Sequence, residues 1–180
     1  MADGLEKFIK FGDEDEEIKR ILEGHAHSSE DGSENFDAED GLQTPDIKPV
    51  KNLDGKPIIV VIDDDYATLD IMKIYLSRDY ECSAFSDPKE AIFYLNSHLP
   101  DIVFVDSYMT VMATKRIVSI IRSYKEMAEV PIYYMVYKEE EDVFNSRPEP
   151  GIEGIITRPI ARGDLQRILD REKMREFVSA

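Results

Sequence analysis

Cysteine and basic residues are scarce in this sequence. Cys82 is the one cysteine, so no intrachain disulfide can form and a reducing compartment is expected. Lys and Arg number 22 against 38 Asp and Glu, which gives a net charge of −16. This balance argues against nucleic-acid binding through a general basic face and against anionic membrane surfaces. Neither a secretory signal nor an apolar stretch of membrane-spanning length is visible, so we expect a cytoplasmic protein.

The acidic residues are concentrated at the N-terminus. Residues 1–56 hold 16 of the 38 Asp and Glu but only 7 of the 22 Lys and Arg. The middle of this segment is rich in Ser, Gly, Asp and Glu, and it has too few large apolar residues to offset the entropy lost on ordering. We therefore predict an acidic, mostly disordered tail over 1–56, with possible short helices in "LEKFIKF" and "EEIKRILEG".

From residue 57 to residue 180 the pattern changes to alternating apolar runs and helical segments. The runs read "IIVVI", "CSAF", "IVFV", "IYYMV" and "GIIT", and helices are expected to begin near Ala67, Asp87, Val111, Glu139 and Ala161. Uninterrupted apolar runs are typical of strands that are buried on both faces of a parallel sheet. Right-handed strand–helix–strand units then predict an α/β fold, a doubly wound five-stranded parallel sheet.

Two helices carry further signals. Asp87 is expected to cap the helix that opens with Pro88. The apolar positions of the last helix predict that four side chains turn inward, namely Leu165, Ile168, Leu169 and Met174.

Carboxylates follow two of the predicted strands. Asp63, Asp64 and Asp65 come directly after the first strand, and Asp106 ends the third. In open α/β sheets a ligand binds beyond the carboxyl ends of the strands, so these acids converge on one crevice if the first and third strands are neighbours. Hard oxygen ligands with open positions suit Mg²⁺. Arg158, at the end of the fifth strand, is expected to reach the same crevice as an anion partner.

Four segments, "IIVVIDDD", "DIVFVDSYM", "VPIYYMV" and "GIEGIITRPI", carry a family resemblance. In their order and spacing, residues 57 to about 172 resemble the receiver domain of two-component response regulators, the family of the chemotaxis regulator CheY. The resemblance implies the strand order 2-1-3-4-5. It also implies that Asp63 and Asp64 hold Mg²⁺ together with Asp106 and the backbone carbonyl of Tyr108. Asp106 would be the phosphoacceptor, and Asp65 would only open the first helix.

Several positions depart from the family pattern. Where the family has Thr or Ser at the end of the fourth strand, this chain has Val136, which cannot hydrogen-bond a phosphoryl group. Arg158 replaces the usual Lys, and its planar fork differs from a compact ammonium group. Ile155 stands at the position of the switch aromatic residue.

Two loop regions depart as well. The segment "TVMAT", residues 110–114, stands where the family loop contains Pro and Gly. Pro148 and Pro150 are expected to shorten or displace the fourth helix of the domain.

The resemblance implies a single-domain response regulator, and we expect no enzymatic turnover. Asp106 would receive its phosphoryl group from a sensor histidine kinase or a phosphotransfer protein. The face made by the fourth helix, fifth strand and fifth helix of the domain would then contact a protein target. One alternative is a degenerate receiver that works as a phosphorylation-independent adaptor. A less favoured alternative is a Mg²⁺-dependent phosphohydrolase of the haloacid-dehalogenase type, because Asp63-x-Asp65 imitates its nucleophile motif.

Overall fold

A computed structural model describes residues 55–179 of the chain, with side chains described as far as residue 175. Apart from Gly55 and Lys56, the predicted acidic tail and its possible helices lie outside these residues.

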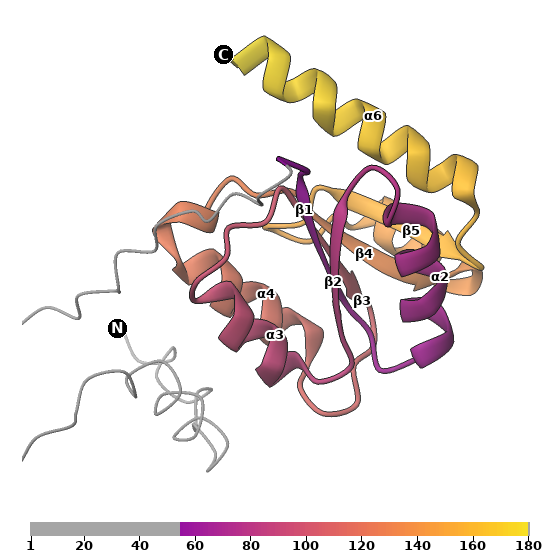
Figure 1. Cartoon of the computed structure of the whole chain (residues 1–180). Coiled ribbons are helices and arrows are strands. Elements are labelled where there is room, and N and C mark those ends of the chain that lie inside the picture. Colours follow the sequence, from indigo (N-terminus) through magenta and orange to yellow (C-terminus); the bar gives the residue numbers. More distant parts are fainter. Residues whose placement is uncertain (1–54, 180) are drawn as a thin grey trace, which may run out of the picture. The chain divides into compact units, whose positions relative to one another are not determined.

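The described residues form one five-stranded parallel sheet with helices on both faces (Figure 1). The strand order is β2-β1-β3-β4-β5, which confirms the predicted doubly wound fold. Each apolar run of the sequence became a strand, and the strands are β1 (Ile58–Ile62), β2 (Glu81–Phe85), β3 (Ile102–Asp106), β4 (Ile132–Tyr137) and β5 (Gly154–Arg158).

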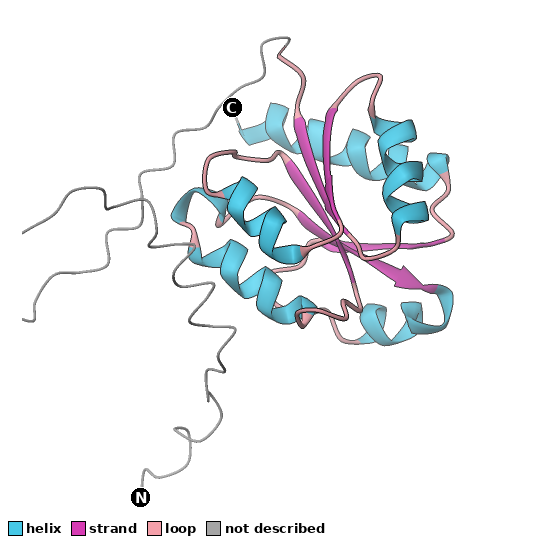
Figure 2. Ribbon diagram, turned by 60° about the horizontal axis from the view of Figure 1, so that its bottom comes forward, coloured by secondary structure: helices cyan, strands magenta, loops and turns pink. Residues whose placement is uncertain are grey.

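The helices alternate with the strands along the chain. They are α2 (Tyr66–Leu76), α3 (Pro88–Leu95), α4 (Thr114–Ser123), α5 (Glu141–Ser146) and α6 (Arg162–Ser179), with short 3₁₀ turns η1 (Lys125–Met127) and η2 (Lys138–Glu140). α2 and α6 cover one face of the sheet, and α3 and α4 cover the other (Figures 1 and 2). All five residues of β1 and all five of β3 are buried, as expected for central strands between two helical layers.

Two helices, α2 and α3, begin directly after an Asp residue whose side chain caps them. Asp65 caps α2 by accepting hydrogen bonds from the backbone N–H groups of Ala67 and Thr68, and Asp87 caps α3 in the same way. α4 begins at Thr114 rather than near Val111, and no side chain caps it. The preceding residues instead form a loop whose hydrogen bonds are described below.

The last two helices test the remaining expectations. α5 has six residues and ends before Pro148, which confirms the predicted shortening. In α6, Leu165 and Leu169 are buried, but Met174 is 65% exposed, so the prediction for Met174 was wrong. Glu172 takes the next buried position, because its carboxylate finds partners on β4 and on α6 itself.

No helix between residues 55 and 179 combines the length and the apolar character needed to cross a bilayer.

Candidate functional site

The predicted convergence of acids is present at the carboxyl edge of the sheet. Asp63 directly follows β1, and Asp106 is the last residue of β3, a neighbouring strand. One carboxylate oxygen from each of Asp63, Asp64 and Asp106 lies within 4.8 Å of the others. Asp63 is fully buried and Asp106 is 4% exposed, while Asp64 is half-buried. The fold therefore places three like charges together in a site with little access to water.

Arg158, the last residue of β5, lies between two of these acids. Its Nη2 is 2.5 Å from Asp63 Oδ2 and 2.9 Å from Asp106 Oδ1, and the side chain is buried. Nη1 donates a hydrogen bond to the hydroxyl of Thr68, and the guanidinium lies 5.2 Å from the ring centroid of Tyr137. Arg158 Nε has no hydrogen-bond partner among the described residues. Contacts with Asp63, Asp106 and Thr68 thus hold the guanidinium in place, and Nε is the nitrogen left without a partner among the described residues.

Burial dominates the electrostatics of the two central acids. Burial raises the pKa of Asp63 to about 6, against the opposing effects of the Asp65 backbone N–H and of Arg158. Burial also raises the pKa of Asp106, and the nearby charge of Arg158 only partly offsets it. One guanidinium therefore does not compensate this group of carboxylates.

The other predicted residues have separate local contacts. Tyr108 donates its backbone N–H to Asp106 Oδ1 at 3.2 Å, and its side chain is 72% exposed. Its carbonyl as a metal ligand stays a prediction. Asp65 is exposed and caps α2, the place expected for it. Val136 is fully buried in β4 and lies beside Thr157 of β5, while Ile155 is half-buried.

Three side chains that form hydrogen bonds in or beside this site were not predicted from the sequence. Thr68 accepts from Arg158 and donates to Asp65 at 2.8 Å. Thr110 donates to Asp64 from its hydroxyl at 2.7 Å and from its backbone N–H at 3.2 Å. Glu140 accepts from the hydroxyl of Ser107, the residue after Asp106, at 3.2 Å. Thr68 lies three residues after the helix cap Asp65, so its contact with Asp65 could have been predicted from the local sequence. The contacts of Thr110 and Glu140 join segments that are distant in the sequence.

The residues present fit a hard divalent cation. Three ionised carboxylates and one guanidinium leave a formal charge of −2, and carboxylate oxygens are the ligands that Mg²⁺ prefers. In this structure Asp63 is hydrogen-bonded through both oxygens, by Arg158 and by the Asp65 backbone N–H. A cation at this site would share these acids with Arg158.

Taken with the fold, this edge defines a class of protein: a doubly wound α/β domain whose β1 and β3 ends form one acidic pocket. A family model described as the response regulator receiver domain matches residues 59–170. The chain belongs to the response regulator receiver family, as the sequence segments indicated.

A curated relative is the hybrid signal transduction histidine kinase D of Dictyostelium discoideum. It is 22% identical over 132 residues, which is 71% of this chain but 8% of that protein. The chain thus spans a small part of the relative's length.

Solved receiver structures share the fold at low sequence identity. CheY4 of Vibrio cholerae, a chemotaxis response regulator, has a TM-score of 0.59 at 19% identity, over 65% of this chain and 98% of that one. A putative response regulator from Chloroflexus aurantiacus has a TM-score of 0.59 at 16% identity, over 65% and 97%. The receiver domain of the sensor histidine kinase PA1611 of Pseudomonas aeruginosa, described with a magnesium ion coordinated in its active-site cleft, has a TM-score of 0.58 at 20% identity, over 64% and 96%.

Proposed function

We propose that this receiver accepts a phosphoryl group on Asp106 in a two-component phosphorelay. The observation that supports this most is the meeting of Asp63, Asp64 and Asp106 within 4.8 Å, with one guanidinium among them. A carboxylate that is buried with uncompensated like charges costs free energy, and such an arrangement is typical of functional sites.

Asp106 would act as a carboxylate nucleophile. One of its oxygens forms a bond to the phosphorus of a phosphohistidine on a histidine kinase or phosphotransfer protein, the P–N bond breaks, and the released imidazole nitrogen takes up a proton. Asp63, Asp64 and Asp106, with the carbonyl of Tyr108, would hold Mg²⁺. The ion would supply charge neutralisation between the acids and the incoming phosphoryl oxygens.

Arg158 has two consequences for this step. Its guanidinium keeps Asp63 and Asp106 in place by direct contacts, so the acceptor is oriented before the phosphodonor arrives. Its buried Nε–H, which has no partner within residues 55–179, is a donor that a phosphoryl oxygen could accept from. The rigid fork of Arg favours this double role over a single ammonium group.

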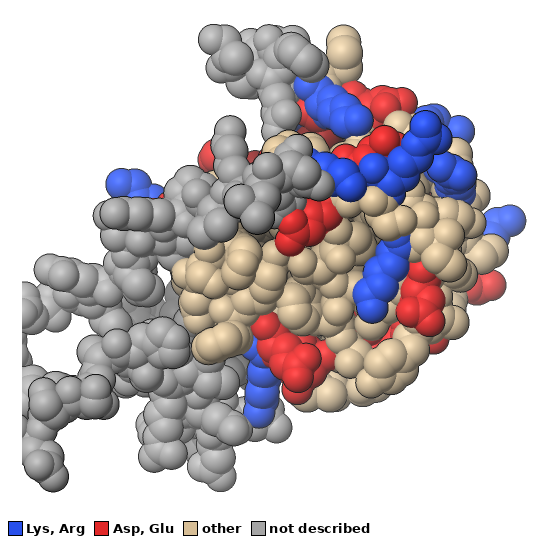
Figure 3. Space-filling model, in the orientation of Figure 1, with Lys and Arg blue, Asp and Glu red and all other residues tan. Residues whose placement is uncertain are grey.

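The output would be contact with a protein target through α5, β5 and α6, the elements expected from the sequence. We do not propose catalytic turnover, and a cytoplasmic location fits a phosphorelay component. A nucleic-acid target is not proposed. On the face drawn in Figure 3, Asp and Glu side chains lie beside the Lys and Arg side chains that gather along α6. The phosphohydrolase alternative is weakened because Asp65, its second carboxylate, caps α2.

A second candidate function is a phosphorylation-independent adaptor. Val136 is fully buried, so the end of β4 has no hydroxyl there to join a phosphoryl group to the surface. A two-state switch needs a contact that differs between its states. If the adaptor hypothesis holds, the partner binds the wild type and an Asp106→Asn variant equally well.

Acetyl phosphate and Mg²⁺ provide the direct test. We expect mass spectrometry to detect one added phosphoryl group on the wild type and none on Asp106→Asn or after chelation of the metal. An Asp65→Asn variant is the matched control, because Asp65 lies in the same acidic run but caps a helix. The absence of any Asp106-dependent mass gain would contradict the proposal and favour the adaptor.

A further inference from the structure

Each acid of the pocket is held in place by a different set of contacts. Asp63 accepts hydrogen bonds from Arg158 and from the Asp65 backbone N–H, and Asp106 contacts Arg158 and the Tyr108 backbone N–H. Neither set includes Asp64. In the described part of the chain, the hydrogen bonds to the Asp64 side chain come from Thr110 alone.

Thr110 places two donors on one oxygen of Asp64. Its hydroxyl lies 2.7 Å and its backbone nitrogen 3.2 Å from Asp64 Oδ2. Two donors on the same oxygen restrain the carboxylate, and the second oxygen accepts no hydrogen bond from the described residues. Thr110 comes from the loop between β3 and α4, 46 residues after Asp64.

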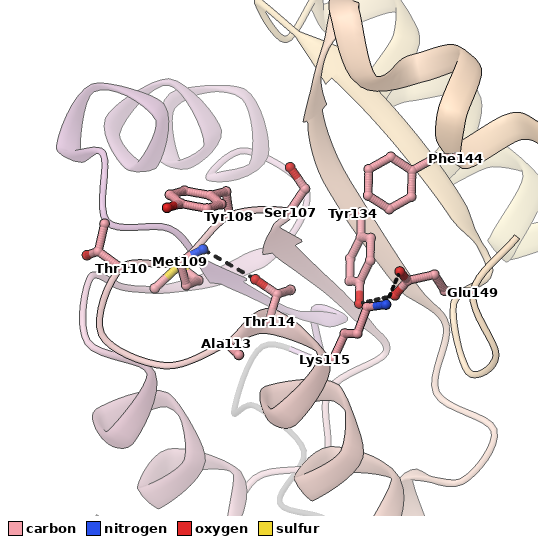
Figure 4. Close-up of a pocket in the computed structure, with 10 residues that line it drawn as sticks. All are labelled: Ser107, Tyr108, Met109, Thr110, Ala113, Thr114, Lys115, Tyr134, Phe144 and Glu149. Carbon is pink, nitrogen blue, oxygen red and sulfur yellow. Dashed lines mark hydrogen bonds and ion pairs between the residues drawn. The ribbon is translucent and has the colours of Figure 1, made fainter. Parts of the chain in front are cut away.

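The loop that carries Thr110 is itself anchored. Thr114, buried at the start of α4, donates its hydroxyl to the backbone carbonyl of Asp106 at 2.8 Å. The same hydroxyl accepts a hydrogen bond from the Met109 N–H at 3.3 Å (Figure 4). The side chains of Met109 and Met112 are buried on either side of Thr110. Thr110 itself is exposed, but these contacts hold the backbone of the loop before and after it.

We propose that Thr110 is a positioning residue of the metal site, which sets Asp64 for a divalent cation. This inference rests on the proposed function. Outer groups that orient a ligand contribute to affinity because the ligand does not have to be ordered when the metal binds. The same loop carries the exposed side chains of Tyr108 and Val111. A cation that orders Asp64 would therefore also order this loop, through the hydrogen bonds between Thr110 and Asp64.

The experiment measures Mn²⁺ binding from the electron paramagnetic resonance signal of the free ion, with Mg²⁺ as competitor. Thr110→Val keeps the size and the backbone N–H but removes the hydroxyl, and Thr110→Ser keeps the hydroxyl. We expect Thr110→Val to weaken binding of both ions about tenfold and Thr110→Ser to stay close to the wild type. Val111→Thr, the reverse exchange at the next position, is the matched control and should bind as the wild type does.

A second readout separates positioning from a purely structural role. Unfolding in urea without metal reports stability, and hydrogen exchange reports protection of the Thr110 amide with and without Mg²⁺. We expect Mg²⁺ to slow exchange of this amide in the wild type but not in an Asp64→Asn variant. If Thr110→Val is less stable but binds the ions as tightly as the wild type, the inference is overturned and the proposed function stands. If the wild type binds neither ion, the proposed metal site falls and the inference with it.

Discussion

The domain has two buried acidic sites, one around Glu172 and one formed by Asp63, Asp64 and Asp106. They differ in how far nearby cations balance the charge of the carboxylates. Glu172 of α6 is 7% exposed, close to the 4% of Asp106. It accepts a hydrogen bond from the hydroxyl of Tyr133, and Arg171 and Arg175 lie at 3.4 and 3.3 Å from its oxygens. Arg175 also pairs with Glu153 at 2.6 Å, so two acids there have two cations, whereas three acids in the pocket share Arg158.

Under the proposed function, the difference separates a site that holds the fold together from one that binds a ligand. Around Glu172 the partners are complete, and the site fixes α6 against β4. In the pocket burial raises the pKa of both Asp63 and Asp106, so their ionised forms are less favourable in the folded chain than in the unfolded chain. A cation bound there would offset this cost, because it would neutralise the buried carboxylates.

Removal of Glu172 should have the largest effect. Glu172→Ala leaves the buried hydroxyl of Tyr133 without its acceptor and takes one of two carboxylates away from Arg175, so we expect the free energy of unfolding to fall by about 3 kcal/mol. Urea denaturation measures this loss. Asp170→Ala, on the exposed side of the same helix, is the control and should change stability by less than about 0.5 kcal/mol. Equal losses in the two variants would contradict the structural role of Glu172.

Addition of Mg²⁺ should stabilise the wild type by a slightly smaller amount. At a concentration about 100 times the Kd, a ligand that binds only the folded state contributes about 2.7 kcal/mol. An Asp63→Asn variant should lose this increment, while Glu172→Gln should keep it. Thermal unfolding with and without Mg²⁺ gives the increment for each variant. A full increment in Asp63→Asn would remove Asp63 from the proposed ligands.

The Mg²⁺ increment should also depend on pH. A protonated Asp63 cannot bind a cation as a carboxylate, and burial raises its pKa to about 6. The increment is therefore expected above this value and lost as the pH falls through it. Without metal the pH dependence has the opposite direction. Because the pKa of Asp63 is higher in the folded chain than in the unfolded chain, its contribution to stability increases as the pH falls from about 6 toward 3.8.

The smallest effect is expected for Asp106→Asn without metal. Burial raises the pKa of Asp106, so a neutral amide removes an unfavourable charge while Asp63 keeps Arg158 as its partner. We expect the free energy of unfolding to rise by about 1 kcal/mol, in urea denaturation above pH 7. A loss as large as that of Glu172→Ala would mean that the two sites are the same in kind.

The sequence predicted the strands and the meeting of the acids because both follow from short-range rules. Buried parallel strands give uninterrupted apolar runs, and the carboxyl ends of parallel strands share one edge of the sheet. These rules place Asp63, Asp106 and Arg158 at the carboxyl ends of their strands, and the strand order implied by the family resemblance makes the first and third strands neighbours.

The same rules could not predict contacts that depend on the conformation of a loop. Nor could they predict which turns of a helix face polar partners instead of the apolar core. Thr110 reaches Asp64 only through the conformation of the β3–α4 loop, for which the sequence offers no periodic signal. Helical spacing placed Met174 on the inner face of α6. At the neighbouring turn, however, the partners of the helix are polar, and Glu172 occupies the buried position.

Tyr137 covers the guanidinium of Arg158 with its ring, and its side chain is 52% exposed. One face of this half-exposed ring is thus directed at the cation that pairs with the acceptor. A molecule that contacts the exposed part of Tyr137 would therefore be one residue away from the buried charges.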